Sequence, residues 1–252
     1  MNPVITSDFY EISAKGEIAV ILIKDKVFDF ITDINQSGKL IDYVDSLENN
    51  PDIKALVFYN DPNSLSNEQY DKFMERILKN AESMDNSGQP SFSEKNIRFR
   101  EINILNTIIK HLADLQVIVA AGLQGDIVTP FIGTSLVADF RYAGEDAVFY
   151  MAHNRYGLHP SGGLPFFLSN YLHHSKALEI QLRESFTAKE ALDLGLITKI
   201  LPKENFEEHL LNEVSQFIKL KYCTIRNTKR LTNFTRKSLF DYFDYEAGLL
   251  NL

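Results

Sequence analysis

Short apolar segments alternate with helix-like segments through the first half of the chain, and this alternation constrains the fold most strongly. Residues 16–23, 55–59 and 115–121 are rich in β-branched and aliphatic side chains and have the length of buried strands. Residues 37–47 and 97–113 space their apolar side chains at helical intervals. Strands separated by helices need crossover connections, so this order predicts an α/β fold with a largely parallel sheet.

The second half is expected to be mainly helical. Thr187 and Glu190 have the spacing of a capping box, in which each side chain bonds a free N–H at the start of a helix. A short strand is predicted over 196–201, and the tail over 204–252 is predicted to be helical. The polar segment 83–95 is expected to form a surface loop.

Composition narrows the class of protein. The 252 residues are 44% hydrophobic and 24% charged, an ordinary globular balance. The net charge of −8 makes nucleic acid or an anionic membrane an unfavourable partner. A single cysteine, Cys223, excludes an internal disulfide and fits a reducing compartment. With no signal-peptide pattern at the start and no apolar run of about 18 residues, we expect a cytoplasmic protein.

Three segments carry a family resemblance. Residues 117–149 combine an apolar strand, a glycine-bearing turn, a helix that ends in Asp139, and an R-x-A…A-x-F pattern. Residues 157–163 read Gly-Leu-His-Pro-Ser-Gly-Gly, and residues 187–202 form a capped helix followed by a strand. In this order and spacing they resemble the crotonase superfamily, the enoyl-CoA hydratase/isomerase family.

The resemblance implies a spiral of ββα units over residues 1–200 and a helical region for trimerisation, or a lid, over 201–252. Members are usually trimers or dimers of trimers and bind an acyl-CoA thioester, so coenzyme A is the implied ligand and no covalently bound cofactor is expected. In the family, two backbone N–H groups stabilise the enolate oxygen, and carboxylates move protons or direct water.

The helix-side N–H donor is in doubt in this sequence. Counting back from Asp139, the three glycines of the family fall on Thr129, Pro130 and Phe131, and the donor position falls on Pro130. Proline has no N–H, and loss of one such donor typically costs about 10²–10³ in rate. A shift of one residue would place the N–H of Thr129 or Phe131 there instead, and Pro130 also suits a plain helix start. Gly125, in the turn before these residues, is a further candidate for binding the CoA thioester.

The second donor is expected in the loop 64–70. Without gaps, Gln69 falls on the donor position and Glu68 on the position where the family has glycine, with Ser66 in the same loop. Lys72 then lies where some members have a lysine near the adenine of CoA.

Other lysines are candidates for contact with the CoA phosphates. Lys24 and Lys26 follow the 16–23 strand, and Lys229 lies in the tail, from which it could reach a neighbouring subunit. Solvated surface charge is the alternative interpretation for all of these lysines, Lys72 included.

The carboxylates of the family are missing. The two hydratase positions hold Gly133 and His153, and the isomerase position holds Ser161. An imidazole can transfer protons near neutral pH, so His153 is the first catalytic candidate. The alternative interpretation is that His153 is a hydrogen-bonded structural residue. His159 with Ser161 is a second candidate, as a nucleophile pair, although side chains two residues apart usually diverge. No metal site is expected.

Two functions remain open. In the first, the protein acts on an acyl-CoA thioester by an enolate-type reaction in which His153 replaces glutamate; hydrolysis, decarboxylation and isomerisation all fit. In the second, it is a catalytically silent homologue that binds acyl-CoA or a partner protein and contributes structure.

Overall fold

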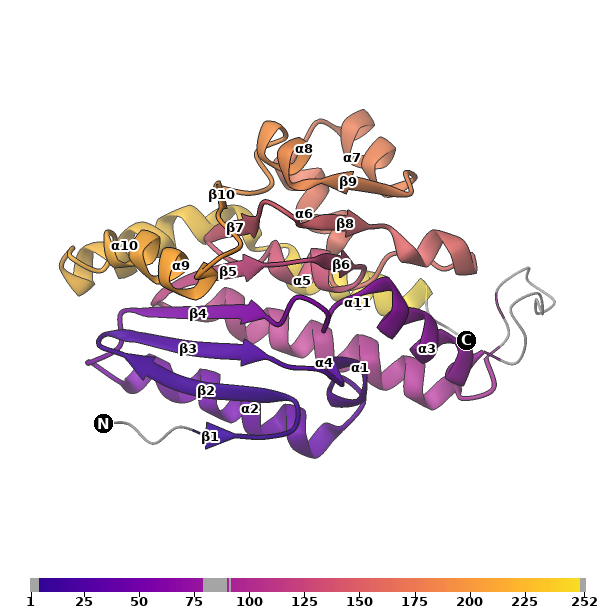
Figure 1. Cartoon of the computed structure of the whole chain (residues 1–252), viewed down its shortest axis with the longest axis horizontal. Coiled ribbons are helices and arrows are strands. Elements are labelled where there is room, and N and C mark those ends of the chain that lie inside the picture. The colour runs from indigo at the N-terminus through magenta and orange to yellow at the C-terminus, as the bar shows by residue number, and fades with distance from the viewer. Residues whose placement is uncertain (1–4, 79–89, 91, 250–252) are drawn as a thin grey trace.

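The computed structural model describes residues 5–78, 90 and 92–249. Seven strands form the larger sheet, in the order β1-β2-β3-β4-β5-β7-β10, and three form the smaller, in the order β6-β8-β9 (Figure 1). The strands are β1 (Ile5–Thr6), β2 (Tyr10–Lys15), β3 (Ile18–Ile23), β4 (Ala55–Asn60), β5 (Ile118–Leu123), β6 (Asp126–Val128), β7 (Phe140–Gly144), β8 (Val148–Tyr150), β9 (Ser185–Thr187) and β10 (Lys199–Leu201).

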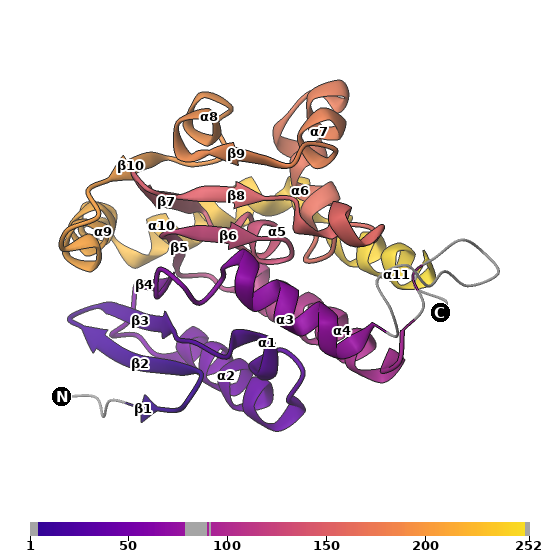
Figure 2. The same ribbon diagram turned by 45° about the vertical axis from the view of Figure 1, so that its right-hand side comes forward.

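The helices cover both faces of the larger sheet. They are α1 (Val27–Phe30), α2 (Ile34–Ser46), α3 (Asn67–Ile77), α4 (Lys95–Asp114), α5 (Phe131–Ser135), α6 (Leu164–Tyr171), α7 (His174–Gln181), α8 (Ala188–Asp193), α9 (Phe206–Ser215), α10 (Tyr222–Thr232) and α11 (Leu239–Leu249), with the 3₁₀ turns η1 (Leu47–Asn49), η2 (Ala152–Tyr156) and η3 (Asn233–Arg236). Figures 1 and 2 show α4 running behind the sheet, between α2 and α11.

The predicted parallel sheet is confirmed. Strands β3, β4, β5, β7 and β10 pair in parallel, while β1 and β2 pair antiparallel at the N-terminal edge. The predicted strand at 115–121 begins later, at Ile118, and the helix predicted over 97–113 is α4. Of the expected loop 83–95, residues 83–89 and 91 lie outside the described residues.

Alternation along the strands builds two cores. In β4, Leu56 packs into the larger core, which includes apolar residues of α2 and α4. Its neighbours Ala55 and Val57 belong to the second core, with Phe206 and Leu210 of α9. Because successive side chains of a strand point to opposite faces, a strand that is apolar throughout must be covered on both sides.

The connection from β5 to β6 carries the chain from the larger sheet into the smaller one. Gly125 makes this turn with a positive φ of 66°, and a Cβ there would lie 2.2 Å from the carbonyl oxygen of Pro62. Only glycine combines an easy positive φ with the absence of a Cβ, so only glycine fits this turn. The turn therefore brings the start of β6 against the loop that precedes α3.

The predicted capping box is present at the start of α8. The Thr187 hydroxyl accepts from the Glu190 N–H at 3.2 Å, and the Glu190 carboxylate accepts from the Thr187 N–H at 2.8 Å. This helix leads into β10, which pairs with β7 at the end of the sheet farthest from β1.

Candidate functional site

Thr129 joins the end of β6 to the turn after β8. Its N–H donates to the carbonyl oxygen of Tyr150 at 3.1 Å, which continues the β6–β8 pairing by one residue. Its hydroxyl oxygen lies 3.1 Å from His153 Nδ1. The Thr129 N–H is therefore already hydrogen-bonded within the protein and does not serve as a free donor.

Pro130 stands at the N-cap of α5, so this short helix begins without an N–H at that position. Its carbonyl oxygen accepts from the N–H and the hydroxyl of Thr134. Phe131, the first residue of α5, has an N–H with no acceptor among the residues that the structure describes. Of the three positions expected to hold the helix-side donor, Thr129 has its N–H bonded to Tyr150 and Pro130 has no N–H. Phe131 is therefore the position with a free N–H among the described residues.

A glycine turn packs directly against α5. Gly162 and Gly163 have φ values of 70° and 69°. A Cβ on Gly162 would meet the Pro130 carbonyl oxygen at 2.4 Å, and a Cβ on Gly133 would meet the Gly162 carbonyl oxygen at 2.3 Å. The position where hydratases carry a glutamate thus lies in backbone-to-backbone contact, which leaves no room for a side chain.

His153 lies in η2 and is only 2% exposed. Burial, with smaller contributions from His159 and Arg98, lowers the pKa of its imidazole from 6.5 to about 4. The ring is therefore neutral near pH 7, with Nδ1 against the Thr129 hydroxyl. A neutral, oriented imidazole can accept a proton, but its low pKa makes it a weak base.

The pairing of His159 with Ser161 is not seen as a hydrogen bond. His159 Nδ1 lies 3.1 Å from the carbonyl oxygen of Pro160, and Ser161 is buried. Burial is the main cause that lowers the pKa of His159, and Arg98 also lowers it. The positive charge of the buried Arg98 guanidinium therefore lowers the pKa of both histidines.

That guanidinium belongs to a buried ion pair that the sequence interpretation missed. Arg98 and Glu101, one turn apart on α4, are 1% and 0% exposed, and Arg98 Nη1 donates to Glu101 Oε2. The other oxygen, Glu101 Oε1, has no hydrogen-bond partner among the described residues. The available signal was two charges on the apolar face that Ile102 and Leu105 continue along α4.

Aromatic rings connect this pair to α5. Tyr70 of α3, whose pKa is raised by burial and also influenced by Arg98 and Glu101, packs against Tyr156 of η2. Phe28 contacts Tyr70, and it also meets Phe131 edge-on at 5.3 Å between ring centroids. We call Arg98, Glu101, His153 and His159 the polar cluster, since they are the buried or half-buried titratable groups linked by the charge of Arg98.

In the loop before α3, Ser66 is the N-cap and its hydroxyl accepts from the Gln69 N–H at 3.4 Å, a long bond. The N–H expected to serve as the second donor is therefore directed at the cap. One residue earlier, the carbonyl oxygen of Leu65 accepts from the Val128 N–H at 3.1 Å. The loop and β6 are thereby fixed to each other.

The candidate lysines each face a carboxylate. Lys24 lies 3.7 Å from Glu11, Lys26 lies 3.6 Å from Asp8 and Lys72 lies 2.7 Å from Glu68. Lys229 is buried, where its ammonium contacts Asp139 and the carbonyl oxygen of Val117, both at 2.7 Å. Lys24, Lys26 and Lys72 remain partly solvent-exposed, whereas Lys229 joins α10 to the residues that directly precede β7 and β5.

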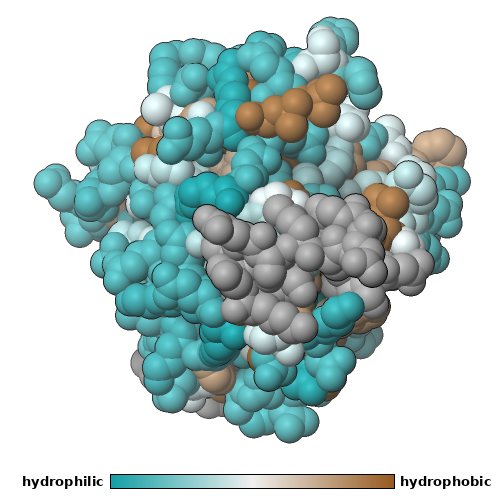
Figure 3. Space-filling view, turned by 90° about the vertical axis from the view of Figure 1, so that its right-hand side faces the viewer, coloured by the Kyte–Doolittle hydropathy of each residue, from teal (hydrophilic) through white to brown (hydrophobic). Residues whose placement is uncertain are grey.

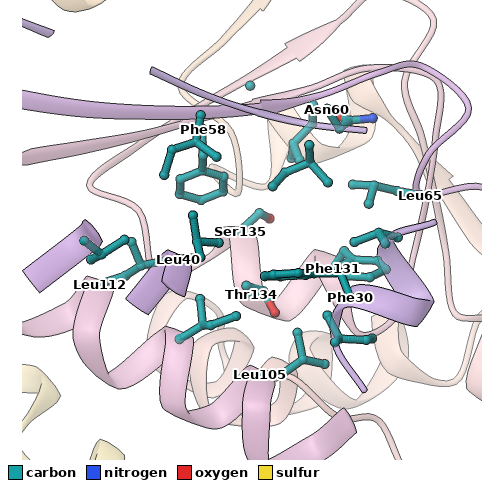
Figure 4. A pocket seen from close by; sticks show the side chains of 18 residues that line it. Phe30, Leu40, Phe58, Asn60, Leu65, Leu105, Leu112, Phe131, Thr134 and Ser135 are labelled. Carbon is teal, nitrogen blue, oxygen red and sulfur yellow. The ribbon is translucent and has the colours of Figure 1, made fainter. Parts of the chain in front are cut away.

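Phe131 also lines an apolar cavity of about 90 Å³ (Figure 4). Side chains from β4, α4, α5 and the loop before α3 line it, among them Phe58, Leu65, Leu105, Leu112 and Phe131. A cavity lined by such residues stays dry and accepts apolar groups. Its size and lining therefore suit a short alkyl chain.

The end of the molecule that carries α3 and α7 is mostly hydrophilic over its described residues, with small separate hydrophobic patches (Figure 3). Within the described part of the chain, no helix is long and apolar enough to cross a membrane. The same residues contain no group of three or more His, Cys, Asp or Glu side chains placed to hold a metal ion.

The strand order, the glycine turn against α5 and the C-terminal helices define a crotonase-type α/β protein. Residues 98–251 match the family model described as enoyl-CoA hydratase/isomerase, and the chain belongs to that family. Two solved enoyl-CoA hydratases show the same fold. The one from Polaromonas sp. JS666 has a TM-score of 0.72 and 20% identity over 96% of this chain and 91% of its own.

The second, from Bacillus halodurans, has a TM-score of 0.73 and 18% identity over 96% of this chain and 92% of its own. Pseudomonas aeruginosa DspI is as similar, with a TM-score of 0.73 and 18% identity over 97% and 96% of the two chains. At these identities the structures establish a shared fold, so the chemistry of this chain has to be argued from its own residues.

Proposed function

We propose that this protein binds an acyl-CoA thioester and moves a proton at the carbon next to the thioester carbonyl, without hydrating enoyl-CoA. The observation that carries the proposal is the polar cluster beside η2, where His153 occupies a glutamate position of the family. Burial of an ion pair such as Arg98 with Glu101 is expensive, and apolar replacements are often as stable or more stable. The presence of this costly ion pair in the core therefore favours a functional role.

Two further features support acyl-CoA as the ligand. The apolar cavity beside Phe131 offers space for a short acyl chain. Lys24 and Lys26, at the end of β3, are partly solvent-exposed cations that could turn toward phosphate groups. We also infer a trimer or hexamer, in a reducing compartment such as the cytoplasm. The exposed Leu231 and Phe234, at 79% and 63%, give the C-terminal region an apolar surface for assembly.

Hydration is excluded from the proposal on physical grounds. A glycine at 133 cannot carry or direct a proton, and Pro130 cannot donate to the thioester oxygen. With the Thr129 N–H bonded to Tyr150, enolate stabilisation has to rely on fewer donors than in a hydratase. We expect proton transfer to be slower than in a two-donor site by about 10²–10³.

The second candidate, a catalytically silent homologue, is favoured by the same engaged donors. In that case the Gln69 N–H is bonded to the Ser66 hydroxyl and Pro130 has no N–H. The Phe131 N–H is then the one candidate donor left among the described residues, which is one short of the pair that an oxyanion hole needs. The polar cluster would then serve binding or architecture alone.

An assay with crotonyl-CoA and longer enoyl-CoA thioesters, together with calorimetric titration of butyryl-CoA, separates these functions from hydration. We expect binding of butyryl-CoA that weakens as the acyl chain outgrows the cavity, and no hydration of any enoyl-CoA. Hydration at a rate that depends on protein concentration would contradict the proposal. Failure of every thioester and of CoA to bind would eliminate acyl-CoA as the ligand in either candidate.

A further inference from the structure

Glu101 is a buried carboxylate with one oxygen held and one oxygen unused. Arg98 Nη1 holds Oε2, while Oε1 has no hydrogen-bond partner among the described residues although the side chain is 0% exposed. A buried acceptor left unsatisfied costs the desolvation of that group, so such an atom calls for an explanation. Its position on α4, next to the guanidinium that influences His153 and His159, points to a ligand.

We propose that Glu101 supplies the proton-transferring carboxylate that positions 133, 153 and 161 lack, and that Oε1 contacts the bound acyl-CoA. This inference rests on the proposed function above. In the step, the C–H bond beside the thioester carbonyl breaks and its proton passes to Oε1. The electron pair of that bond forms the C=C bond of the enolate while the π pair of the thioester C=O moves onto its oxygen, and the reverse step returns a proton to carbon. Neither an oxidant nor a reductant is needed.

The ion pair gives this carboxylate suitable properties. Burial raises the pKa of Glu101 and the adjacent Arg98 opposes that rise, so the carboxylate is a stronger base than a solvated glutamate. Arg98 also fixes the orientation of the carboxylate, which leaves Oε1 as the free acceptor.

A second buried glutamate shows what a fully satisfied carboxylate looks like in the same region. Glu246 of α11 is 2% exposed, and its oxygens accept from Asn106 Nδ2 at 3.0 Å and from the Tyr242 hydroxyl at 3.2 Å. Both oxygens are used to join α11 to α4 and to its own preceding turn. Glu246 is therefore a matched control, equally buried but with no free oxygen.

The test is deuterium uptake by butyryl-CoA in D₂O, followed by mass spectrometry, on the full chain. Glu101→Gln removes the basic oxygen and is expected to lower the uptake rate by about 100-fold or more. Because it leaves Arg98 buried and unpaired, which can impair folding, the double variant Arg98→Gln with Glu101→Gln is measured beside it. Thermal unfolding and calorimetric binding of butyryl-CoA confirm that each variant is folded and loaded.

Loss of uptake in the folded variants, with binding retained and with Glu246→Gln near the wild-type rate, supports the inference. Uptake at the wild-type rate in the folded double variant overturns it and leaves the proposed function standing. A wild-type protein that binds butyryl-CoA but exchanges no deuterium, or that does not bind it, refutes the proposed function, and the role of Glu101 with it.

Discussion

Gly133→Glu, which restores the carboxylate that hydratases carry at this position, is expected to unfold the protein at a much lower temperature rather than create a hydratase. The added Cβ would lie 2.3 Å from the carbonyl oxygen of Gly162 and 2.7 Å from the N of Leu164. Both neighbours are backbone atoms, so the clash can be relieved only by separating α5 from the glycine turn.

We expect Gly133→Ala already to cost about 3 kcal/mol, at the upper end of typical overpacking. For a chain of this size that corresponds to a melting temperature lower by about 6–12 °C. Glutamate should cost more. Thermal unfolding followed by circular dichroism measures the change.

Gly38→Ala is the matched control for this experiment. Gly38 lies within α2, where a Cβ would meet no atom within 4 Å. Alanine should therefore stabilise the helix slightly, by about 0.5–1 kcal/mol. If Gly133→Ala melts at the wild-type temperature, α5 and the glycine turn are not in the close contact described above.

The second large effect concerns pH. The imidazole of His153 has a pKa lowered from 6.5 to about 4 in the folded protein, chiefly by burial. Between these two values the unfolded chain binds a proton that the folded protein does not. Stability is therefore unaffected by this group above about pH 6.5 and falls as the pH decreases toward 4. At about pH 4.5 the loss should be about 2–3 kcal/mol relative to pH 7.

Urea unfolding of the wild type and of His153→Gln at these two pH values measures this contribution. The glutamine variant should lose less stability on acidification, because it carries no proton-binding group at this position, while His159 and the buried Glu101 and Glu246 remain common to both proteins. His174→Gln, on the exposed start of α7, should keep the wild-type pH dependence. An identical pH dependence in wild type and His153→Gln would contradict the burial of a neutral imidazole.

Several elements of the fold could be predicted from local sequence patterns. Strands β3, β4 and β5 were predictable because each is a short run of apolar residues flanked by polar ones, and the Thr187–Glu190 pair marks a helix start by its chemistry alone. Strand β2 was missed. Its residues 10–15 are half polar, and they form a strand because they pair with β3 in a hairpin at the sheet edge.

The site was only partly predictable. Counting along the chain put His153 and Pro130 at positions of known importance in the family. It could not show that the Thr129 N–H donates to the Tyr150 carbonyl oxygen or that the Thr129 hydroxyl contacts His153. Arg98 and Glu101 lie more than 50 residues from His153, and only the folded chain brings the charge of Arg98 within range of this imidazole. Likewise, no local pattern shows that Gly133 faces the backbone of Gly162.

Deuterium uptake by butyryl-CoA in D₂O, in the presence of the wild-type protein, distinguishes a protein that moves a proton on acyl-CoA from a catalytically silent homologue. The measurement reports proton transfer at the carbon next to the thioester carbonyl and requires no assumption about the later reaction. We predict uptake that rises in proportion to protein concentration, while crotonyl-CoA remains unhydrated in the same buffer. A folded protein that binds butyryl-CoA and gives uptake no faster than the protein-free solution would contradict it.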